Sequence, residues 1–522
     1  MSNVLGRGMG VDTRLSEHYT FLWFLFSKIR CLREVEMTAF FAIVKLTCRS
    51  LVRSRVFQLL LATLAGTIIF LPLTVVGDGT ALAHIQVSLK YSLGAVGMIL
   101  SASIVWVGCS IMGDDVASRQ LHMVVSKPVS KPLVWLAKWT GVVVSHGFLL
   151  LLSAGMVYVL VLWRFERSSF SDKEKKRIRH EVLTGRRVFL PKRPDLDEIA
   201  AKELDRRLSR LPPERRKSTP EQRCEMLWQV RKEVVASLGA VPPGRVRSWE
   251  YSGLTFGEKS PLYLRYRAYV GKVDSNGQRE TRGMWLARVN IVAKGDGAGK
   301  DKGSARGGAA GKVRTLFSPR TNYPEVIPCG VFVEITMNPN VISKDGSVEV
   351  RFVNYDPQGK QLFFQPKDGP KLLVEEIGFI SNYLRAVLVL FAKLAFLAGV
   401  ACAAGGIMST PVAIFGVVSY ILAGSFSAYL IGVENWIVES SGIPGKQTLV
   451  EVVGNSLSKV LLLFIMPIQN FEVSGLLAKG ELIEWGLIGQ VVFFDAVVRG
   501  VPLMLLGMWL YSRRELGLAA KK

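Results

Sequence analysis

The chain has 522 residues and is 49% hydrophobic, and its 66 lysines and arginines outnumber its 42 aspartates and glutamates, so its formal net charge is +24. This combination is typical of a membrane protein with a basic extramembrane part. It argues against a nucleic-acid-binding protein, which does not need windows of about 20 uncharged apolar residues. The six cysteines form no Cys-x-x-Cys pair and no cluster with histidine, so neither a zinc site nor a redox motif is indicated.

The N-terminal segment changes character at Met37. Residues 1–36 contain an apolar run, YTFLWFLF (19–26), which is too short to span a bilayer. From Met37 onward the spacing predicts a helix whose apolar face is formed by Phe40, Val44, Cys48 and Leu51. A basic stripe on another face consists of Lys45, Arg49 and Arg53. We expect this helix to lie in the membrane interface before the first span, and we hypothesise that residues 1–36 are a mis-called extension.

Six uncharged apolar runs are long enough to cross a membrane as helices. They cover residues 56–76, 92–112, 141–163, 386–408, 411–432 and 486–511. Lysines and arginines gather before the first run, between the second and third, and after the sixth, so the positive-inside rule places these ends and both termini in the cytoplasm. The loop 77–91 and the segment 164–385 are then outside, because segments longer than about 60 residues translocate largely regardless of charge.

The outside segment divides into two parts by composition. Residues 172–237 are rich in Lys, Arg and Glu, and their apolar residues recur at helical spacing, which predicts short helices. Residues 241–375 contain period-two runs separated by turn residues, which predicts a β-sandwich. Within it, the Gly- and Lys-rich stretch 294–312 predicts a disordered loop. Cys224 and Cys329 belong to this segment, as a disulfide or as two unpaired thiols.

These patterns predict an α-helical bundle of six transmembrane helices with an inserted extracytoplasmic α+β domain that contains a β-sandwich. Residues 37–163 hold the interfacial helix, the first three spans and a cytoplasmic segment at 113–139. Residues 386–511 hold spans four to six, and 512–522 form a cytoplasmic tail. Between the last two spans, residues 455–475 are apolar but too interrupted to predict a seventh span.

The cytoplasmic segment 113–139 reads GDDVASRQLHMVVSKPVSKPLVWLAKW. An acid, a triplet, a repeated Ser-Lys unit and a final lysine follow in order: Asp115, Ser118-Arg119-Gln120, Val125-Ser126-Lys127-Pro128-Val129-Ser130-Lys131 and Ala137-Lys138. This order resembles the cytoplasmic segment of ABC-transporter permeases of the type-2 exporter class, in the branch of the copper-site-maturation permease of nitrous oxide reductase. Gln120 stands where that branch has Thr, and Ala137 where it has Gly. The resemblance continues in 381–415 and Arg513-Arg514-Glu515 but does not include the outside domain.

The resemblance implies that the segment docks on a separate ATPase subunit. Pro128 and Pro132 restrict the backbone, so the lysines are presented on a stiff turn. The residues expected to carry the coupling are Asp115, Arg119, Ser126, Lys127, Pro128, Lys131 and Lys138. The simpler alternative is a solvated basic loop that only sets the topology. The resemblance also implies that 455–475 is a re-entrant or interfacial segment.

No ATPase motif is present in the chain itself. The Gly-Lys strings at 295–300, 307–312 and 442–446 lack the first glycine of a P-loop, and the residue after each Gly-Lys is also wrong. We therefore expect no enzyme, no catalytic residue, no metal and no cofactor here, with ATP bound by a partner ABC ATPase subunit. A second permease copy or a paralogue is expected to complete a dimer.

Three ionisable residues lie inside apolar runs: Lys393, Asp495 and Arg499. Such residues usually face the interior of a bundle and find partners there. One interpretation is a polar lining that a substrate or a conformational switch uses. The simpler one, which we favour, is that Asp495 and Arg499 pair across one helical turn, while Lys393 extends to the membrane surface or joins the same aspartate.

The sequence thus predicts a multi-pass permease of the cytoplasmic (inner) membrane, working in an ATP-driven exporter or in a mechanotransmission complex. The outside domain is expected to bind an extracytoplasmic protein or an anionic polymer, and no nucleic acid. The rival prediction is a non-transporting membrane-anchored receptor that binds an envelope component through its β-sandwich. A membrane-embedded hydrolase is the weakest of the three alternatives, since no His-Glu-x-x-His or Gly-x-Ser-x-Gly motif occurs in the sequence.

Overall fold

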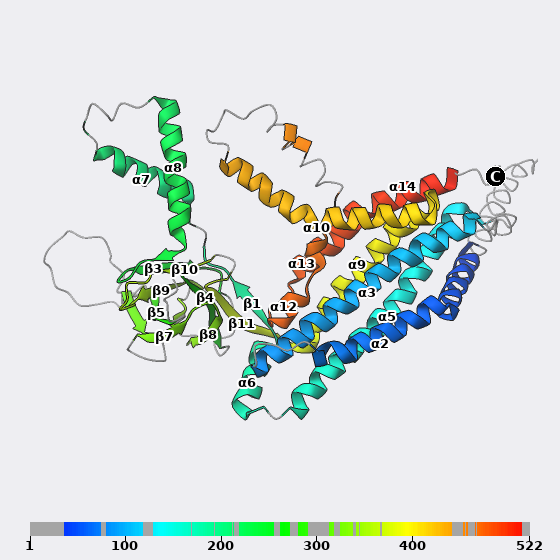
Figure 1. Cartoon of the computed structure of the whole chain (residues 1–522), viewed down its shortest axis with the longest axis horizontal. Helices are drawn as coiled ribbons and strands as arrows, with labels where there is room; N and C mark the ends of the chain where they lie inside the picture. The colour runs from blue at the N-terminus through cyan, green and yellow to red at the C-terminus, as the bar shows by residue number, and fades with distance from the viewer. Residues whose placement is uncertain are drawn as a thin grey trace, which may run out of the picture.

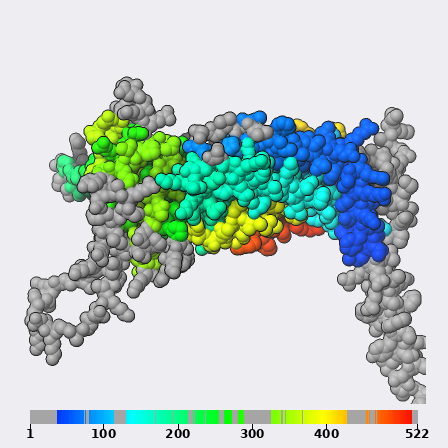
Figure 2. Space-filling view, turned by 90° about the horizontal axis from the view of Figure 1, so that it is seen from below, coloured from blue at the N-terminus to red at the C-terminus, as the bar shows by residue number. Residues whose placement is uncertain are grey.

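Long helices form one elongated bundle, and a β domain lies at one of its ends (Figure 1). Figure 2 shows the same division from another side, with the β domain in green and the helix of residues 36–53 in deep blue at the opposite end. The structure is a computed structural model that describes residues 36–74, 80–117, 129–168, 170–192, 194–210, 212, 219–254, 261–271, 280–290, 313–317, 324–337, 341–343, 345–365, 368–440, 453–454, 456–457, 465 and 467–513.

The bundle is built from helices that precede and follow the β domain. Those that precede it are α2 (Arg55–Thr74), α3 (Ala81–Ala117) and α5 (Lys131–Arg167). Those that follow it are α9 (Phe379–Ile407), α10 (Thr410–Ser440) and a last helix composed of α13 (Trp485–Gly489), the π-helical η4 (Gln490–Arg499) and α14 (Gly500–Arg513). Two short elements precede this last helix: η3 (Ile468–Phe471) and α12 (Ser474–Ala478).

Among the described residues, 5 helical stretches are long and apolar enough to cross a membrane: Arg55–Pro72, Ala81–Gly113, Lys131–Arg167, Phe379–Ile407 and Trp485–Arg513. They overlap five of the predicted runs, so by the length and composition of its helices the chain is a multi-pass membrane protein. The predicted loop 77–91 is too long, because α3 already begins at Ala81. The remaining predicted run, 411–432, lies in α10, where the stretch Thr410–Phe426 is a shorter apolar helix.

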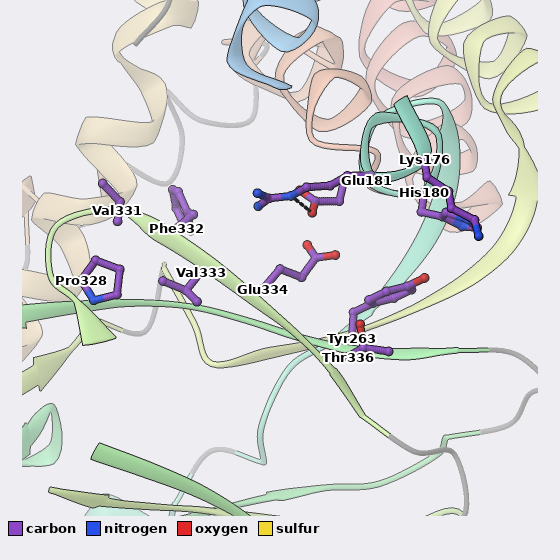
Figure 3. A pocket seen from close by; sticks show the side chains of 11 residues that line it. Lys176, His180, Glu181, Tyr263, Pro328, Val331, Phe332, Val333, Glu334 and Thr336 are labelled. Atoms are coloured by element: carbon purple, nitrogen blue, oxygen red, sulfur yellow. Dashed lines mark hydrogen bonds and ion pairs between the residues drawn. The ribbon is translucent and has the colours of Figure 1, made fainter. Parts of the chain in front are cut away.

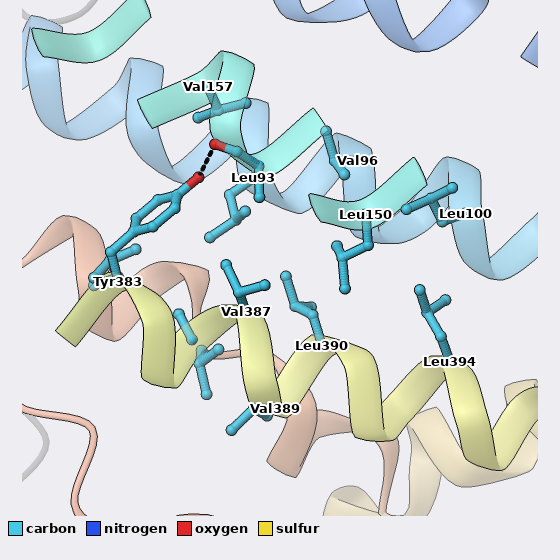
Figure 4. Close-up of a cluster of buried hydrophobic side chains, with 14 of the residues drawn as sticks. Leu93, Val96, Leu100, Leu150, Val157, Tyr383, Val387, Val389, Leu390 and Leu394 are labelled. Atoms are coloured by element: carbon cyan, nitrogen blue, oxygen red, sulfur yellow. Dashed lines mark hydrogen bonds between the residues drawn. The ribbon is translucent and has the colours of Figure 1, made fainter. Parts of the chain in front are cut away.

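Helices α3, α5 and α9 meet in a continuous apolar core (Figure 4). Its buried side chains recur at helical spacing on all three helices and include Leu93, Val96, Leu100, Leu150, Val157, Val387, Leu390 and Leu394. Within this core the hydroxyl of Tyr383 donates a 2.7 Å hydrogen bond to the carbonyl oxygen of Ala154. This bond satisfies the one polar group of the tyrosine side chain. Of the five candidate spans α9 is the most extensively buried, which makes it the central helix of the bundle.

Glycines allow α9 to approach its neighbours closely. A Cβ on Gly405 would overlap the backbone of Cys109 in α3, and a Cβ on Gly406 would lie 3.0 Å from the ring of Tyr511 in α14. On the α14 side, a Cβ on Gly507 would overlap α9 itself. Small residues at such contacts let helices associate in a membrane with their backbones close together. These contacts at Gly405, Gly406 and Gly507, which we call the glycine seam, join α3, α9 and α14 into one unit.

The helix of residues 36–53 has the predicted amphipathic character. Its basic side chains are exposed, whereas its predicted apolar face is buried or half-buried. This face lies against α5, where a Cβ on Gly141 would be 2.7 Å from the side chain of Thr47. Cys48 also directs its Sγ toward the carbonyl oxygen of Gly141 at 3.5 Å. The hypothesised extension 1–36 lies outside the described residues except for its last position.

The segment between α5 and α9 begins with short helices, as predicted: α6 (Asp172–Glu181), α7 (Leu196–Ser209) and α8 (Pro220–Leu238). Helices α7 and α8 form a hairpin that projects from the β domain (Figure 1) and has its own small core of Ala200, Leu204 and Val230. One strand, β1 (Thr184–Phe189), lies where helices alone were predicted. Because β1 pairs with the last strand of the domain, local spacing could not reveal it.

Two antiparallel sheets form the β domain. The first has the order β1-β11-β4-β10-β2, with β8 also paired to β4, and the second has the order β3-β9-β5-β6, with β7 also paired to β5. After β1 the strands are β2 (Ala240–Val241), β3 (Val246–Tyr251), β4 (Leu262–Val270), β5 (Glu280–Asn290), β6 (Val313–Phe317), β7 (Glu325–Pro328), β8 (Phe332–Met337), β9 (Val348–Asn354), β10 (Leu362–Phe364) and β11 (Lys371–Gly378).

The two sheets pack against one apolar core, the arrangement predicted for 241–375. Trp285 of the second sheet has its ring 4.8 Å from that of Tyr266 and 5.7 Å from that of Phe364, both in the first sheet. Cys224 and Cys329 are unpaired thiols, which decides between the two alternatives left open by the sequence. The predicted loop 294–312 lies outside the described residues.

The described part of the segment 455–475 includes η3 and the start of α12. Helix α12 contacts α3 and α9 in the bundle. At this contact a Cβ on Gly94 of α3 would lie 3.7 Å from the Oγ of Ser474. The end of the segment is thus held against the central helices.

Candidate functional site at the junction of bundle and β domain

The described parts of the predicted coupling segment, residues 113–117 and 129–139, lie at the end of the bundle away from the β domain (Figure 1). Its residues Arg119, Ser126, Lys127 and Pro128 lie outside the described residues. Asp115 lies in the last turns of α3, and the structure describes its backbone but not its side chain. The structure thus places two of the predicted charged side chains, Lys131 and Lys138, both in the first turns of α5.

Lys131 and Lys138 connect the start of α5 to the ends of two other helices. The Nζ of Lys131 donates to the carbonyl oxygen of Ser512 in α14 at 3.2 Å. The Nζ of Lys138 donates to the carbonyl oxygen of Ile111 in α3 at 3.5 Å. Cations are favourable near the C-terminal end of a helix because the helix dipole is negative there. Lys131 therefore holds the end of α14 to the start of α5, and Lys138 joins the start of α5 to α3, in addition to any role toward a partner.

Asp495 and Arg499 form the ion pair that the simpler interpretation predicted, with Nη1 and Oδ1 2.9 Å apart. The carboxylate is buried, and its other oxygen accepts a hydrogen bond from Nδ2 of Asn470 at 3.2 Å. Lys393 is half-buried and interacts electrostatically with Glu472, in the connection between η3 and α12. The structure therefore places Lys393 within electrostatic range of a carboxylate that the sequence interpretation did not consider.

A buried ionic cluster lies where the first sheet meets the bundle. The guanidinium of Arg186, which is fully buried on β1, lies 2.5 Å from Oε1 of Glu334 on β8. The same carboxylate is 3.0 Å from Nε of Arg265 on β4, and Arg265 is also 3.6 Å from Glu481, which follows α12. Both arginines donate to the carbonyl oxygen of Lys479 at 3.2 Å. The cluster thus joins three strands to the segment before the last span.

Backbone hydrogen bonds fix the same segment, residues 479–483, to β1. The amide of Arg186 donates to the carbonyl oxygen of Gly480 at 2.8 Å, and the amide of Leu482 donates to the carbonyl oxygen of Arg186 at 2.7 Å. Gly480 has a φ of 65°, and a Cβ there would overlap the carbonyl group of Glu181, so this position requires glycine. Segment 479–483 therefore acts as an additional strand-like partner for β1.

The first turn of α9 completes the junction. The side-chain amide of Asn382 donates to the carbonyl oxygen of Glu481 at 2.9 Å, and its oxygen accepts from the amide of Ile483 at 2.9 Å. One turn further along, Arg385 donates to the carbonyl oxygen of Ile483 at 3.0 Å. Asn382 is completely buried, so both ends of its amide need these partners. The central helix is therefore attached to the same segment as β1.

Burial shapes the electrostatics of the cluster. It raises the pKa of the Glu181 carboxyl, and the negative charge of Glu334 raises this pKa further, while Arg177 and Arg186 lower it. Burial also lowers the pKa of Arg186, while Glu334 acts in the opposite direction. Burial and the neighbouring Glu375 raise the pKa of Tyr263 above its ordinary range. The cluster therefore concentrates opposite charges in a site from which water is largely excluded.

A pocket of about 540 Å³ opens beside the cluster, between α6 and the outer face of the first sheet. Figure 3 shows Glu181 and Glu334 facing one another in it, with apolar Val331 and Phe332 on one side and His180 on the other. His180 lies 2.8 Å from Glu375, which also accepts from the hydroxyl of Tyr263 at 3.3 Å. Charged groups of α6 and of the first sheet therefore line the same pocket.

Sequence reasoning missed the junction. A signal was present in β4, where Tyr263, Arg265 and Arg267 alternate with buried Leu262, Leu264 and Tyr266. A charged row on the outer face of a strand usually indicates solvent, so nothing local showed that Arg265 is buried by the bundle.

Comparisons with known proteins found no matching family, no matching curated protein and no matching solved structure.

Proposed function

We propose that this chain is the transmembrane subunit of an ATP-driven complex of the type-2 ABC-exporter kind, and that it transmits movement from a cytoplasmic ATPase to its own external domain. The observation that carries this proposal is the direct connection between β11 and α9. Strand β11 ends at Gly378 and α9 begins at Phe379, so no linker separates the β domain from the central helix.

The junction strengthens this connection. Segment 479–483 binds β1 through backbone hydrogen bonds and the first turns of α9 through Asn382 and Arg385. Since β1 and β11 are neighbours in one sheet, α9 is linked to this sheet both along the chain and across it. A rotation of α9 therefore carries the sheet with it, whereas a flexible anchor would need neither link.

The opposite end of the bundle is the proposed ATPase-docking end. There Lys131 and Lys138 hold the start of α5 to the ends of α14 and α3. Through the glycine seam, α3 and α14 contact α9. A push on the segment 113–139 would thus reach α9 through its two closest neighbours, as packed helices move together.

Topology and partners follow from the same proposal. With the predicted run 411–432 in α10 as a sixth span, the segment 113–139 and both termini lie in the cytoplasm, and the β domain lies outside the cytoplasmic membrane. Two copies of this chain, or this chain and a paralogue, assemble with two ATPase subunits that bind ATP. The basic external domain engages an extracytoplasmic protein or an anionic polymer.

Co-purification tests the proposal directly. The full chain is isolated in mild detergent from its own cells and compared with Asp115→Lys combined with Lys127→Glu. A matched control reverses two exposed charges on α6, Asp172→Lys with Lys173→Glu. We expect an ATPase with a complete P-loop to accompany the wild type and the control but not the first variant, because reversed charges repel a complementary surface. Absence of any ATPase from the wild type would favour the membrane-anchored receptor instead.

A further inference from the structure

A groove of about 890 Å³ lies within the membrane bundle, away from the junction. It runs along the π-helical part of the last span and is closed on another side by η3. The residues that line it are Pro467, Gln469, Asn470, Gly486, Gly489, Gln490, Phe493, Phe494, Asp495 and Arg499. Neither the predicted coupling nor the junction uses any of these residues. Asp495 and Arg499 were interpreted only as an ion pair that satisfies itself.

Local structure explains why the groove is open. Gly486 and Gly489 present no side chain to it, and a Cβ at either position would have no neighbour within 4 Å. The π-helix Gln490–Arg499 widens the helix turn, a feature that occurs often at functional sites. On the opposite wall, Nε2 of Gln469 donates to the carbonyl oxygen of Ser425 in α10 at 2.7 Å and holds η3 in place.

The inner part of the groove carries opposite charges. Asp495 is 3% exposed and accepts hydrogen bonds from Arg499 at 2.9 Å and Asn470 at 3.2 Å. The side chain of Arg499 is 30% exposed, and within the described part of the chain its guanidinium, which has five N–H donors, donates to Asp495 alone. An arginine in a membrane span is costly unless these donors are satisfied. Donors therefore remain for a ligand in the groove.

The mouth of the groove is aromatic. Phe493 and Phe494 are 57% and 58% exposed, and their rings contact edge to face at 5.5 Å. These side chains belong to a span, so they offer an apolar surface to an acyl chain at the side of the bundle. An inner charged pair and an outer aromatic surface form an amphiphilic site.

We propose that this groove binds an amphiphile whose head group carries a phosphate and an ammonium, as a zwitterionic phospholipid does. The phosphate accepts from the remaining N–H groups of Arg499, the ammonium lies beside Asp495, and the acyl chains lie over Phe493 and Phe494. A free phosphate would gain nothing from the aromatic surface, and an anionic lipid would gain nothing from the carboxylate. This binding does not require an ATPase, so it stands or fails separately from the proposed coupling.

The test is retention of a defined lipid by the full chain. Purified protein in detergent is mixed with equal amounts of phosphatidylethanolamine and phosphatidylglycerol and repurified, and the bound lipid is quantified by mass spectrometry. We expect phosphatidylethanolamine to be enriched over phosphatidylglycerol. Arg499→Gln should weaken its binding about tenfold, the typical effect of losing a charge-assisted hydrogen bond. Excess inorganic phosphate should not displace the lipid.

Further variants keep the test decisive if Arg499→Gln fails to fold. Phe493→Ala with Phe494→Ala changes exposed side chains only and should also lower retention. The matched control is Arg513→Gln, which removes the same charge from the C-terminal end of the last helix, away from the groove, and should retain the lipid as the wild type does. Equal retention of both lipids, displacement by inorganic phosphate, or retention unchanged in the phenylalanine variant would each overturn the proposal.

Discussion

The ionic cluster makes the strongest prediction for a single substitution, Glu334→Gln. The side chain of Glu334 is 6% exposed and lies within 3.0 Å of both Arg186 and Arg265, which are 0% and 9% exposed. Removing one partner of a buried ion pair typically costs about 3–5 kcal/mol, because the charge left behind stays buried. In a domain of about 200 residues this lowers the melting temperature by roughly 10 °C.

The assay is thermal unfolding of the full chain in detergent, followed by tryptophan fluorescence, to which the buried Trp285 contributes. The matched control is Glu376→Gln on β11 of the same sheet. Its partner Arg187 is 2.8 Å away, but the two side chains are 38% and 40% exposed. Exposed pairs contribute about 0–1 kcal/mol, so this control should unfold close to the wild type. Equal melting temperatures for the two variants would refute the assigned role of the cluster.

Gly405→Val should force α3 and α9 apart at Cys109, since overpacking typically costs about 1–3 kcal/mol. Size-exclusion chromatography should then show a lower yield of monodisperse protein. The control Gly416→Ala, at a position with open space, should leave this yield unchanged. Gly480→Ala should release segment 479–483 from β1, because alanine is strained at a φ of 65° and meets a carbonyl group, and faster amide hydrogen exchange of that segment would show it. Glu181→Gln should change the pH dependence of unfolding. The folded pKa of Glu181 is raised, so its contribution to stability is complete below the unfolded pKa and is lost as pH rises through the folded one. The melting temperature of the variant relative to wild type should therefore increase from pH 4 to pH 8, and a decrease would contradict the assigned direction.

The sequence was sufficient for features that depend on local periodicity. Apolar runs of span length predicted the five long apolar helices, and alternation predicted strands such as β4, β5 and β9 of the β domain. The i, i+4 spacing of Asp495 and Arg499 predicted their ion pair. These signals persist in the folded chain because neighbours in sequence stay neighbours in a helix or strand.

Features that depend on pairing between segments distant in the sequence could not be predicted from the sequence. β1 exists because it pairs with β11, almost 190 residues later, and its sequence TGRRVF has no strand-like alternation of its own. Arg186, Glu334 and Glu481 meet from three separate parts of the chain, so no spacing could connect them. Similarly, Glu472 comes within electrostatic range of Lys393 only because the segment before α12 folds back on α9.

The most direct test of the central claim measures ATP-driven movement of the β domain. Spin labels on introduced cysteines at Ser237 in α8 and Leu59 in α2, both exposed, report the distance between the β domain and the edge of the bundle. The measurement uses the reconstituted complex with its ATPase, and Cys48 and Cys224 are replaced by serine. We expect trapped ATP to shift this distance in the wild type and Glu334→Gln to reduce the shift. An unchanged distance with ATP bound would contradict mechanical transmission through α9.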